Sequence, residues 1–195
     1  MKKAIVFIAA TVALATLWAA PVAVGLKISK PQTSVSKSGS DKPKGANRRG
    51  THKATEIKNS VFEYKGKVSC TPPKDTTVTV TLEAYFITRS IGNGAQDELS
   101  SRKEIDKYEF GGDYPKTYDF TLTTPAITQT TVTTVKTSGH RRRGGGSSST
   151  SKDKSGTRLM GVIVRAMVDG KPVKVVTEPS NSRWEAAAKK DTIEL

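Results

Sequence analysis

Residues with chemically reactive side chains are few in this 195-residue sequence, and their spacing does not gather them. His52 and His140 are the two histidines, and Cys70 is the single cysteine. Both histidines lie in flexible basic segments, whereas metal ligands and catalytic triads need partners held at defined spacing on a rigid frame. No glycine-rich phosphate loop stands between a strand and a helix. The sequence therefore predicts no metal, no cofactor and no nucleophile–histidine pair.

Two further patterns have the composition of a catalytic site. Ser-x-x-Lys strings begin at Ser34, Ser149 and Ser151, but they fall in Ser/Lys-rich sequence where chance matches are expected, and lysine-activated serines use this spacing on a helix. Paired carboxylates do acid–base work when a fold brings them together. An acidic cluster is thus the single possible seat for an enzyme, although a solvated surface is the expected role of its candidates: Glu98, Glu104, Asp106, Glu109, Asp113 and Asp119. We expect a non-enzymatic protein without a small-molecule substrate.

Positive charge is concentrated in two segments. The formal net charge is +14, and residues 26–55 hold eight Lys/Arg against one Asp, whereas residues 56–138 hold ten basic and eleven acidic side chains. Arg48 and Arg49, together with Arg141, Arg142 and Arg143, are therefore candidates for binding a polyanion such as an anionic glycan or a lipid headgroup. Both segments lack the aromatic side chains that stack on bases, so specific nucleic-acid recognition is not expected.

The same segments are poor in large apolar residues. Residues 26–55 are predicted to be a disordered basic tail, because they cannot bury enough apolar area to offset chain entropy. Residues 138–156 are predicted to be a flexible basic insert within a single domain over residues 56–195. A loop of that length is either functional or merely tolerated. Its lack of an apolar anchor favours the second reading.

The N-terminal residues 1–25 have the layout of a secretory signal peptide. Lys2 and Lys3 precede an apolar run of about 15 residues, which is followed by small residues ending at Gly25. Cleavage after Gly25 fits the small-x-small rule best, with Ala19 or Ala20 as alternatives, and an N-terminal membrane anchor is the competing interpretation. We expect an exported protein of the periplasm, the outer membrane surface or the extracellular space.

Apolar and polar residues alternate in the middle of the chain, as in half-buried strands. The clearest run extends from Val78 to Phe86, with Thr, Glu83 and Tyr85 on the other face. Further strands are predicted at 61–70, 105–110, 118–122, 127–135, 159–168 and 172–177. Asp169-Gly170 is the favoured pair for a type I′ turn between the last two.

A single helix is expected at the C-terminal end. Ser182-Arg183-Trp184-Glu185 reads as a capping box, and good helix formers follow it. About seven antiparallel strands favour an all-β, immunoglobulin-like β-sandwich with a short C-terminal helix, with a closed barrel as the alternative. Trp184 is expected to pin the helix onto the sheet or to serve as an interface anchor. Cys70 is expected to be buried at a strand end, the alternative being a crosslink to a second chain.

The C-terminal half also carries a resemblance. Gly161-Val162-Ile163-Val164-Arg165, Glu178-Pro179-Ser180 and Trp184-Glu185, with the earlier runs 82–86 and 118–122, resemble secreted β-sandwich proteins of the Verrucomicrobia–Planctomycetes lineage. The resemblance spans roughly residues 78–185 and implies an immunoglobulin-like domain, with a link to a pilus-like gene cluster in one such protein. The Arg-Gly-Ser stretch at 141–150 departs from that pattern.

These observations lead to a functional hypothesis. We expect a structural or interaction module of the cell envelope, pilus-associated or adhesive, whose partner is an envelope or pilus protein or a second copy of itself. The alternative is a polyanion-binding module that uses the basic tail and insert. The sequence leaves the partner, the oligomeric state and the binding face open.

Overall fold

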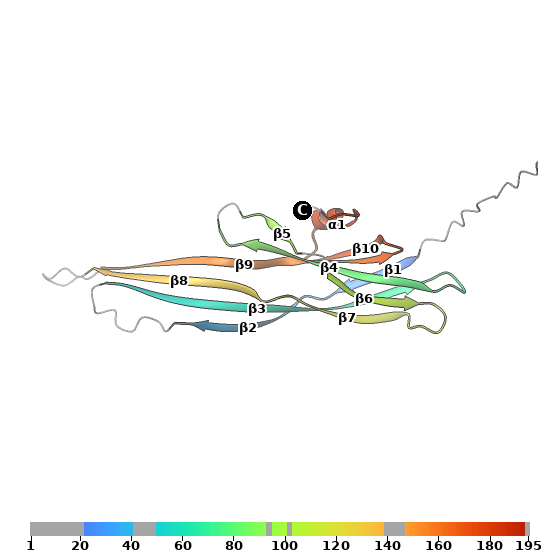
Figure 1. Ribbon diagram of the computed structural model, residues 1–195, viewed down its shortest axis with the longest axis horizontal. Helices are drawn as coiled ribbons and strands as arrows, with labels where there is room; N and C mark the ends of the chain where they lie inside the picture. Colours follow the sequence, from blue (N-terminus) through green and yellow to red (C-terminus); the bar gives the residue numbers. More distant parts are fainter. Residues whose placement is uncertain (1–21, 41–49, 93–94, 101–102, 139–146, 194–195) are drawn as a thin grey trace, which may run out of the picture.

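The computed structural model of the chain describes residues 22–40, 50–92, 95–100, 103–138 and 147–193. In this part of the chain the fold is all-β and antiparallel, with ten strands and one short helix (Figure 1). The all-β prediction is confirmed, with more strands than the seven expected. The elements are β1 (Ala23–Ile28), β2 (Gln32–Gly39), β3 (Gly50–Thr71), β4 (Val78–Ser90), β5 (Asp97–Leu99), β6 (Lys103–Phe110), β7 (Thr117–Thr123), β8 (Ile127–Ser138), β9 (Ser147–Val168), β10 (Lys171–Glu178) and α1 (Ser182–Ala188).

The ten strands form one continuous sheet that curls into a half-barrel. Two 22-residue strands hold it together, because each changes partners along its length. β3 pairs with β2 and β8 in its first half and with β1 and β7 in its second. β9 pairs first with β8, then with β4 and β10.

The main core lies inside this curl. The alternating apolar residues of β4, including Val80, Leu82 and Phe86, are buried against Tyr64 and Val68 of β3. Cys70 is buried beside the end of β3, as the sequence predicted, and the chain then turns at Pro72-Pro73. Asp169 and Gly170 adopt φ values of 50° and 75° between β9 and β10, which confirms the predicted tight turn.

A second apolar cluster covers the outer face of β4 and β9. Trp184 of α1 packs there with Tyr85, Ile87 and Ile163. A Cβ on Gly161 would stand 2.7 Å from the Trp184 ring, so glycine permits this close approach. β4 is consequently buried on both faces, whereas the sequence predicted that one of its faces would be exposed to solvent. Trp184 is 5% exposed and packs within the chain, which favours the role of pinning α1 to the sheet over the alternative role of an interface anchor.

The helix cap also differs from the prediction by one residue. Asn181 is the N-cap, and its Oδ1 accepts hydrogen bonds from the backbone N–H groups of Arg183 and Trp184. Asn caps as well as Ser does, and Glu185 is engaged elsewhere, since its Oε1 accepts from Thr177 Oγ1 at 3.3 Å.

The polar halves of the long strands form an arm that extends beyond the core (Figure 1). We define the arm as β2, residues 50–60 of β3, β8 and residues 147–156 of β9. The structure corrects the predicted disorder of 26–55 and 138–156 for their described residues, which lie largely in strands. The prediction counted apolar burial alone. Residues 50–55 and 147–156 extend strands whose other halves are anchored in the core, so they inherit a fixed register, and β2 pairs with the strand so extended.

Candidate binding face on the arm

The basic residues singled out from the sequence lie mostly outside the described residues. This holds for Arg48 and Arg49, for Arg141, Arg142 and Arg143, and for His140. The strands that flank them are described, and their ends meet. Gly50 is the register partner of Thr137, and Ser138 is the partner of Ser147. The described strand ends that flank these residues in sequence therefore lie at the same end of the arm.

Strand pairing brings other lysines onto one face of the arm. Directly opposed residues of neighbouring strands point to the same side of a sheet. Lys37 of β2 lies opposite Lys58 of β3. Across the arm, Lys152 and Lys154 of β9 lie opposite Thr133 and Thr131 of β8, which in turn face Ala54 and Glu56 of β3. We call this side, carrying Lys37, Lys58, Lys152 and Lys154, the lysine face.

The lysine face has an excess of positive charge. Among its described residues Glu56 is the one carboxylate, and its Oε1 lies 3.3 Å from Lys37 Nζ. Both side chains are more than half exposed, so this ion pair contributes little to stability. Four ammonium groups against one carboxylate give the face a net charge of +3. The opposite face carries Lys53, Lys136 and Asp153 by the same register, a net +1.

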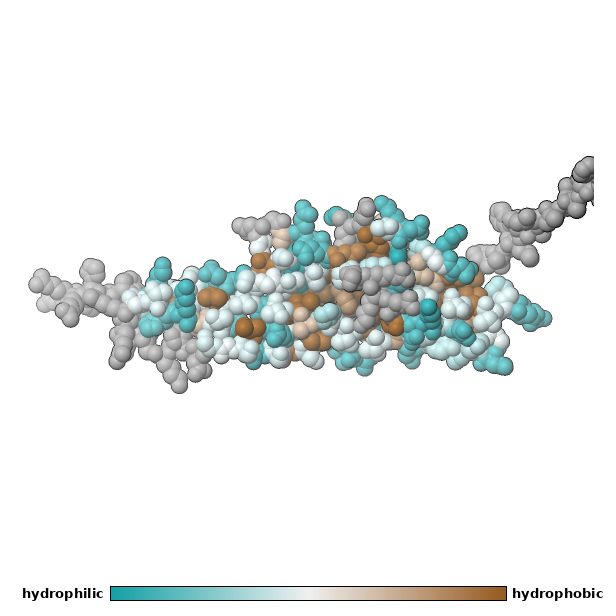
Figure 2. All heavy atoms as spheres, viewed as in Figure 1, coloured by the Kyte–Doolittle hydropathy of each residue, from teal (hydrophilic) through white to brown (hydrophobic). Residues whose placement is uncertain are grey.

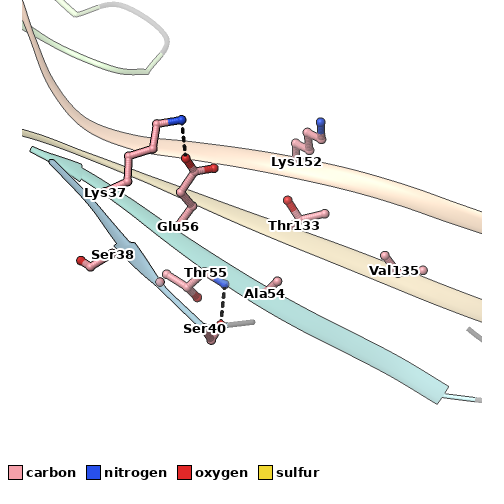
Figure 3. A pocket seen from close by; sticks show the side chains of 10 residues that line it. Lys37, Ser38, Ser40, Ala54, Thr55, Glu56, Thr133, Val135 and Lys152 are labelled. Atoms are coloured by element: carbon pink, nitrogen blue, oxygen red, sulfur yellow. Dashed lines mark hydrogen bonds and ion pairs between the residues drawn. The ribbon is translucent and has the colours of Figure 1, made fainter. Parts of the chain in front are cut away.

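A hollow of about 700 Å³ opens beside these residues. Figure 3 shows Lys37, Glu56 and Lys152 projecting to the same side, above Ala54 and Thr133. Ser40 closes one edge, where its Oγ accepts a hydrogen bond of 3.0 Å from the Thr55 backbone N–H. The hollow lies between Lys37 and Lys152, and most of the other residues that line it are small or carry hydroxyl groups. The full lining consists of Lys37, Ser38, Gly39, Ser40, Ala54, Thr55, Glu56, Thr133, Val135 and Lys152.

The structure gives the Ser-x-x-Lys strings a different meaning. In a strand, residues three apart point to opposite faces, so Ser34 cannot meet Lys37, nor Ser149 meet Lys152. The lysines of these strings belong to the lysine face. In the sequence these strings have the character of chance matches, although Lys37, Lys152 and Lys154 lie within the basic tail and insert considered for polyanion binding. Lys58 was not singled out, because the pairing register between distant strands decides which lysines share a face.

Among the acidic candidates, the structure places Asp106, Glu109 and Asp119 apart from one another. Asp119 pairs with Lys67 at 3.4 Å on the surface, and Asp106 and Glu109 of β6 point to opposite faces because they are three residues apart. Within the described ranges no group of three His, Cys, Asp or Glu residues is placed to hold a metal ion. His52 lies in β3 opposite Val135, on the lysine face.

A buried ion pair under the C-terminal segment is a feature that sequence reasoning missed. Arg165 Nε donates to Glu83 Oε2 at 2.7 Å, and Arg165 Nη2 donates to the Tyr85 hydroxyl at 3.1 Å. Arg165 Nη1 also donates to the Lys190 carbonyl at 3.0 Å. The side chains of Arg165 and Glu83 are 5% and 2% exposed. Their position beneath the C-terminal segment indicates a structural role.

Two further findings bear on what the chain is. No helix in the described ranges is both long and apolar enough to cross a membrane. Comparison of the chain with protein-family models, curated proteins and solved structures found no match.

Proposed function

We propose that this protein is an exported, non-enzymatic structural module of the bacterial envelope that assembles through the edges of its arm. Export rests on the layout of residues 1–25. The observation that carries assembly is the arm itself. Its four strands contact their neighbours in the sheet, and its two outer strand segments, β2 and residues 148–156 of β9, are exposed.

Both edges of the arm are open. β2 pairs with β3 on one side only, and all eight of its residues are exposed. Among the described strands, residues 147–155 of β9 pair with β8 on one side only. Unpaired N–H and C=O groups along such edges are ready to pair with another strand. A strand from a second copy fits best, because the two edges lie on opposite sides of one sheet and have similar Ser/Lys-rich sequences.

Pairing of β2 in one copy with residues 147–156 in the next continues the sheet from copy to copy. Such head-to-tail contacts generate open filaments when their rotation does not close a ring. A filament agrees with the pilus link implied by the resemblance, and an adhesive role would follow from its surface exposure. We further propose that the part of the chain that contains the main core forms the immunoglobulin-like sandwich expected from the sequence.

The edges can be blocked without removing the pairing inside the sheet. The Ser40 backbone N–H donates to the Thr55 carbonyl at 2.9 Å, so alternate residues of β2 face β3 and the N–H of Val35 points outward. Val35→Pro therefore removes an outward donor only. On the other edge, the Gly156 carbonyl accepts from Ile91 N–H on the outer side, and Thr150→Pro blocks an outward donor by the same alternation.

Sedimentation and crosslinking of the full chain test this proposal. The unaltered protein is expected to form concentration-dependent oligomers, whereas Val35→Pro and Thr150→Pro each yield monomers with unchanged circular dichroism. An equimolar mixture of the two variants restores one pairing and gives dimers. Val35→Thr is the matched control, because it removes the exposed apolar side chain but keeps the N–H, and it should assemble normally.

Each contrary outcome is informative. If Thr150→Pro alone still dimerises, pairing is two-fold through β2 and the filament is wrong. If the unaltered chain stays monomeric at about 100 μM, well above the dissociation constants of stable assemblies, edge assembly is refuted.

The structure also bears on processing of the signal peptide. β1 begins at Ala23, and Val24 and Leu26 pack against the main core. Cleavage after Gly25 would remove half of this strand, whereas cleavage after Ala19 or Ala20 would leave it whole. We therefore expect the mature N-terminus to precede Ala23, as mass spectrometry of the secreted protein would show. A mature chain that begins at Leu26 would contradict this expectation.

A further inference from the structure

We propose that the lysine face binds a linear polysaccharide that carries sulfate or carboxylate groups. This inference is independent of edge assembly, because it uses side chains that project from the sheet rather than backbone groups in its plane. It concerns Lys37, Lys58, Lys152 and Lys154, which were not among the basic residues singled out from the sequence.

The first argument is the arrangement of the charges. Lys37 and Lys152 stand on opposite outer strands of the arm, β2 and β9, which are three inter-strand spacings or about 14 Å apart. At the level of Lys152, β3 and β8 supply the small side chains of Ala54 and Thr133, whereas Glu56 and Lys58 stand on β3 nearer Lys37. The result is a surface with cationic side chains on both outer strands and a low stretch between them beside Lys152. An extended chain with anionic groups on both sides matches this shape.

The second argument is charge that the chain leaves unbalanced. Lys37 and Lys58 are direct cross-strand partners, an arrangement in which like charges repel. Glu56 reaches Lys37, but the described residues of this face supply no second carboxylate. Lys152 and Lys154 are exposed. An anionic ligand would relieve this repulsion, and the hydroxyl of Thr133 beside the hollow is suited to hydrogen-bond sugar hydroxyls.

The third argument selects a glycan over other polyanions. Nucleic-acid binding modules place aromatic side chains for base stacking, and the described residues of the lysine face include no Phe, Tyr or Trp. Peripheral membrane proteins insert apolar side chains between headgroups. The side of the arm seen in Figure 2 has mainly hydrophilic and intermediate colours, and Val35 is the one exposed large apolar side chain among the described residues of the lysine face. Lysines act as point charges, which suits anionic groups spaced along a polymer.

Binding of the full chain to heparin, polygalacturonate and neutral dextran, measured by calorimetry at about 50 mM and 200 mM salt, tests the proposal. We expect salt-sensitive binding to at least one anionic glycan and none to dextran. Replacing Lys37, Lys58, Lys152 and Lys154 with Gln should weaken binding about tenfold or more and flatten its salt dependence. Comparison of heparin with polygalacturonate distinguishes sulfate from carboxylate as the recognised group.

A matched control distinguishes binding at the lysine face from attraction by the net charge of the protein. Replacing Lys53, Lys74, Lys136 and Lys174 with Gln removes the same charge from exposed positions elsewhere, and binding should change by no more than about twofold. Glu56→Gln removes the carboxylate of the lysine face and should tighten binding. Circular dichroism verifies that each variant is folded.

Three results would overturn the proposal. The two quadruple variants could lose equal affinity, which would indicate unspecific attraction. Glu56→Gln could leave the affinity unchanged, which would place the glycan elsewhere. Single-stranded DNA or phosphatidylglycerol vesicles could bind more tightly than either glycan and depend on the same four lysines, which would assign the face to a different class of partner.

Discussion

The buried ion pair of Glu83 and Arg165 gives the sharpest stability prediction. Glu83→Gln keeps the shape of the side chain but removes the charge that compensates a guanidinium of which 5% is exposed. Breaking one partner of a buried pair costs about 3–5 kcal/mol, because the other charge stays buried without compensation. A small domain has about 5–15 kcal/mol of total stability, so the loss is a large fraction of it.

Asp119→Asn is the matched control for this substitution. It breaks the ion pair of Asp119 with Lys67, in which the side chain of Lys67 is 66% exposed and that of Asp119 is 78% exposed. The substitution should lower the free energy of unfolding by about 0–1 kcal/mol. Urea unfolding of both variants, followed by tryptophan fluorescence and far-ultraviolet circular dichroism, measures the two costs. A double variant of Glu83→Gln with Arg165→Met should recover part of the loss, since the uncompensated charge is gone.

The reasoning would be refuted by equal costs for Glu83→Gln and Asp119→Asn. Such a result would mean that water or a rearranged C-terminal segment solvates Arg165. The three hydrogen bonds that Arg165 makes to Glu83, Tyr85 and the Lys190 carbonyl would then contribute little to the fold.

Three other predictions follow from burial. Trp184→Ala should destabilise the protein by about 3–5 kcal/mol and expose the C-terminal residues to proteolysis before the rest, because the ring pins α1 to the sheet. Burial raises the pKa of the Cys70 thiol, so a thiol reagent at pH 8 should react with it much faster in about 6 M urea than in buffer. Burial, with a smaller contribution from Glu178, raises the pKa of Tyr64 from 10.0 to about 12. The folded state therefore holds this proton more tightly, so its contribution to stability is present below pH 10 and is lost as pH rises through 12; Tyr64→Phe should lessen that loss in alkaline unfolding curves.

The strands of the core were predictable because their burial is written in local alternation. The run from Val78 to Phe86 alternates with period two, and its apolar residues do face the core. Local alternation could not show that the other face of this strand is also buried. Glu83 and Tyr85 look like solvent-facing residues until the partner Arg165, about 80 positions later, and α1 are placed over them.

The arm was not predictable from composition. Residues 32–39 and 147–156 have the Ser, Lys and Gly content of disordered segments, and nearly all of them are exposed in the strands they form. Order there comes from the backbone ladder rather than from apolar burial. Thr-rich β8 in the middle, with its high β propensity, was the one arm strand that the sequence indicated.

The candidate site was hidden for the same reason. Lys37 and Lys58 are 21 residues apart in sequence, and Lys152 is almost 100 residues further, so their common face depends on three strand registers, β2–β3, β3–β8 and β8–β9. A test that depended on deleting residues 27–55 would remove β2 and the start of β3 together, and with them the face itself. Point substitutions are therefore the appropriate probes of polyanion binding in this chain.

The edges and the lysine face can be used at the same time, because strand pairing occupies the plane of the sheet and leaves its faces free. If β2 of one copy pairs with residues 147–156 of the next, the sheet continues and successive lysine faces lie on one continuous surface, related by the twist of the strands. A polysaccharide long enough to span several copies would then bind with an avidity that no single arm provides. Edge-blocked variants should accordingly keep the affinity for short glycans and lose much of it for long ones. An equal loss for both lengths would show that the lysine face is formed between copies rather than within one.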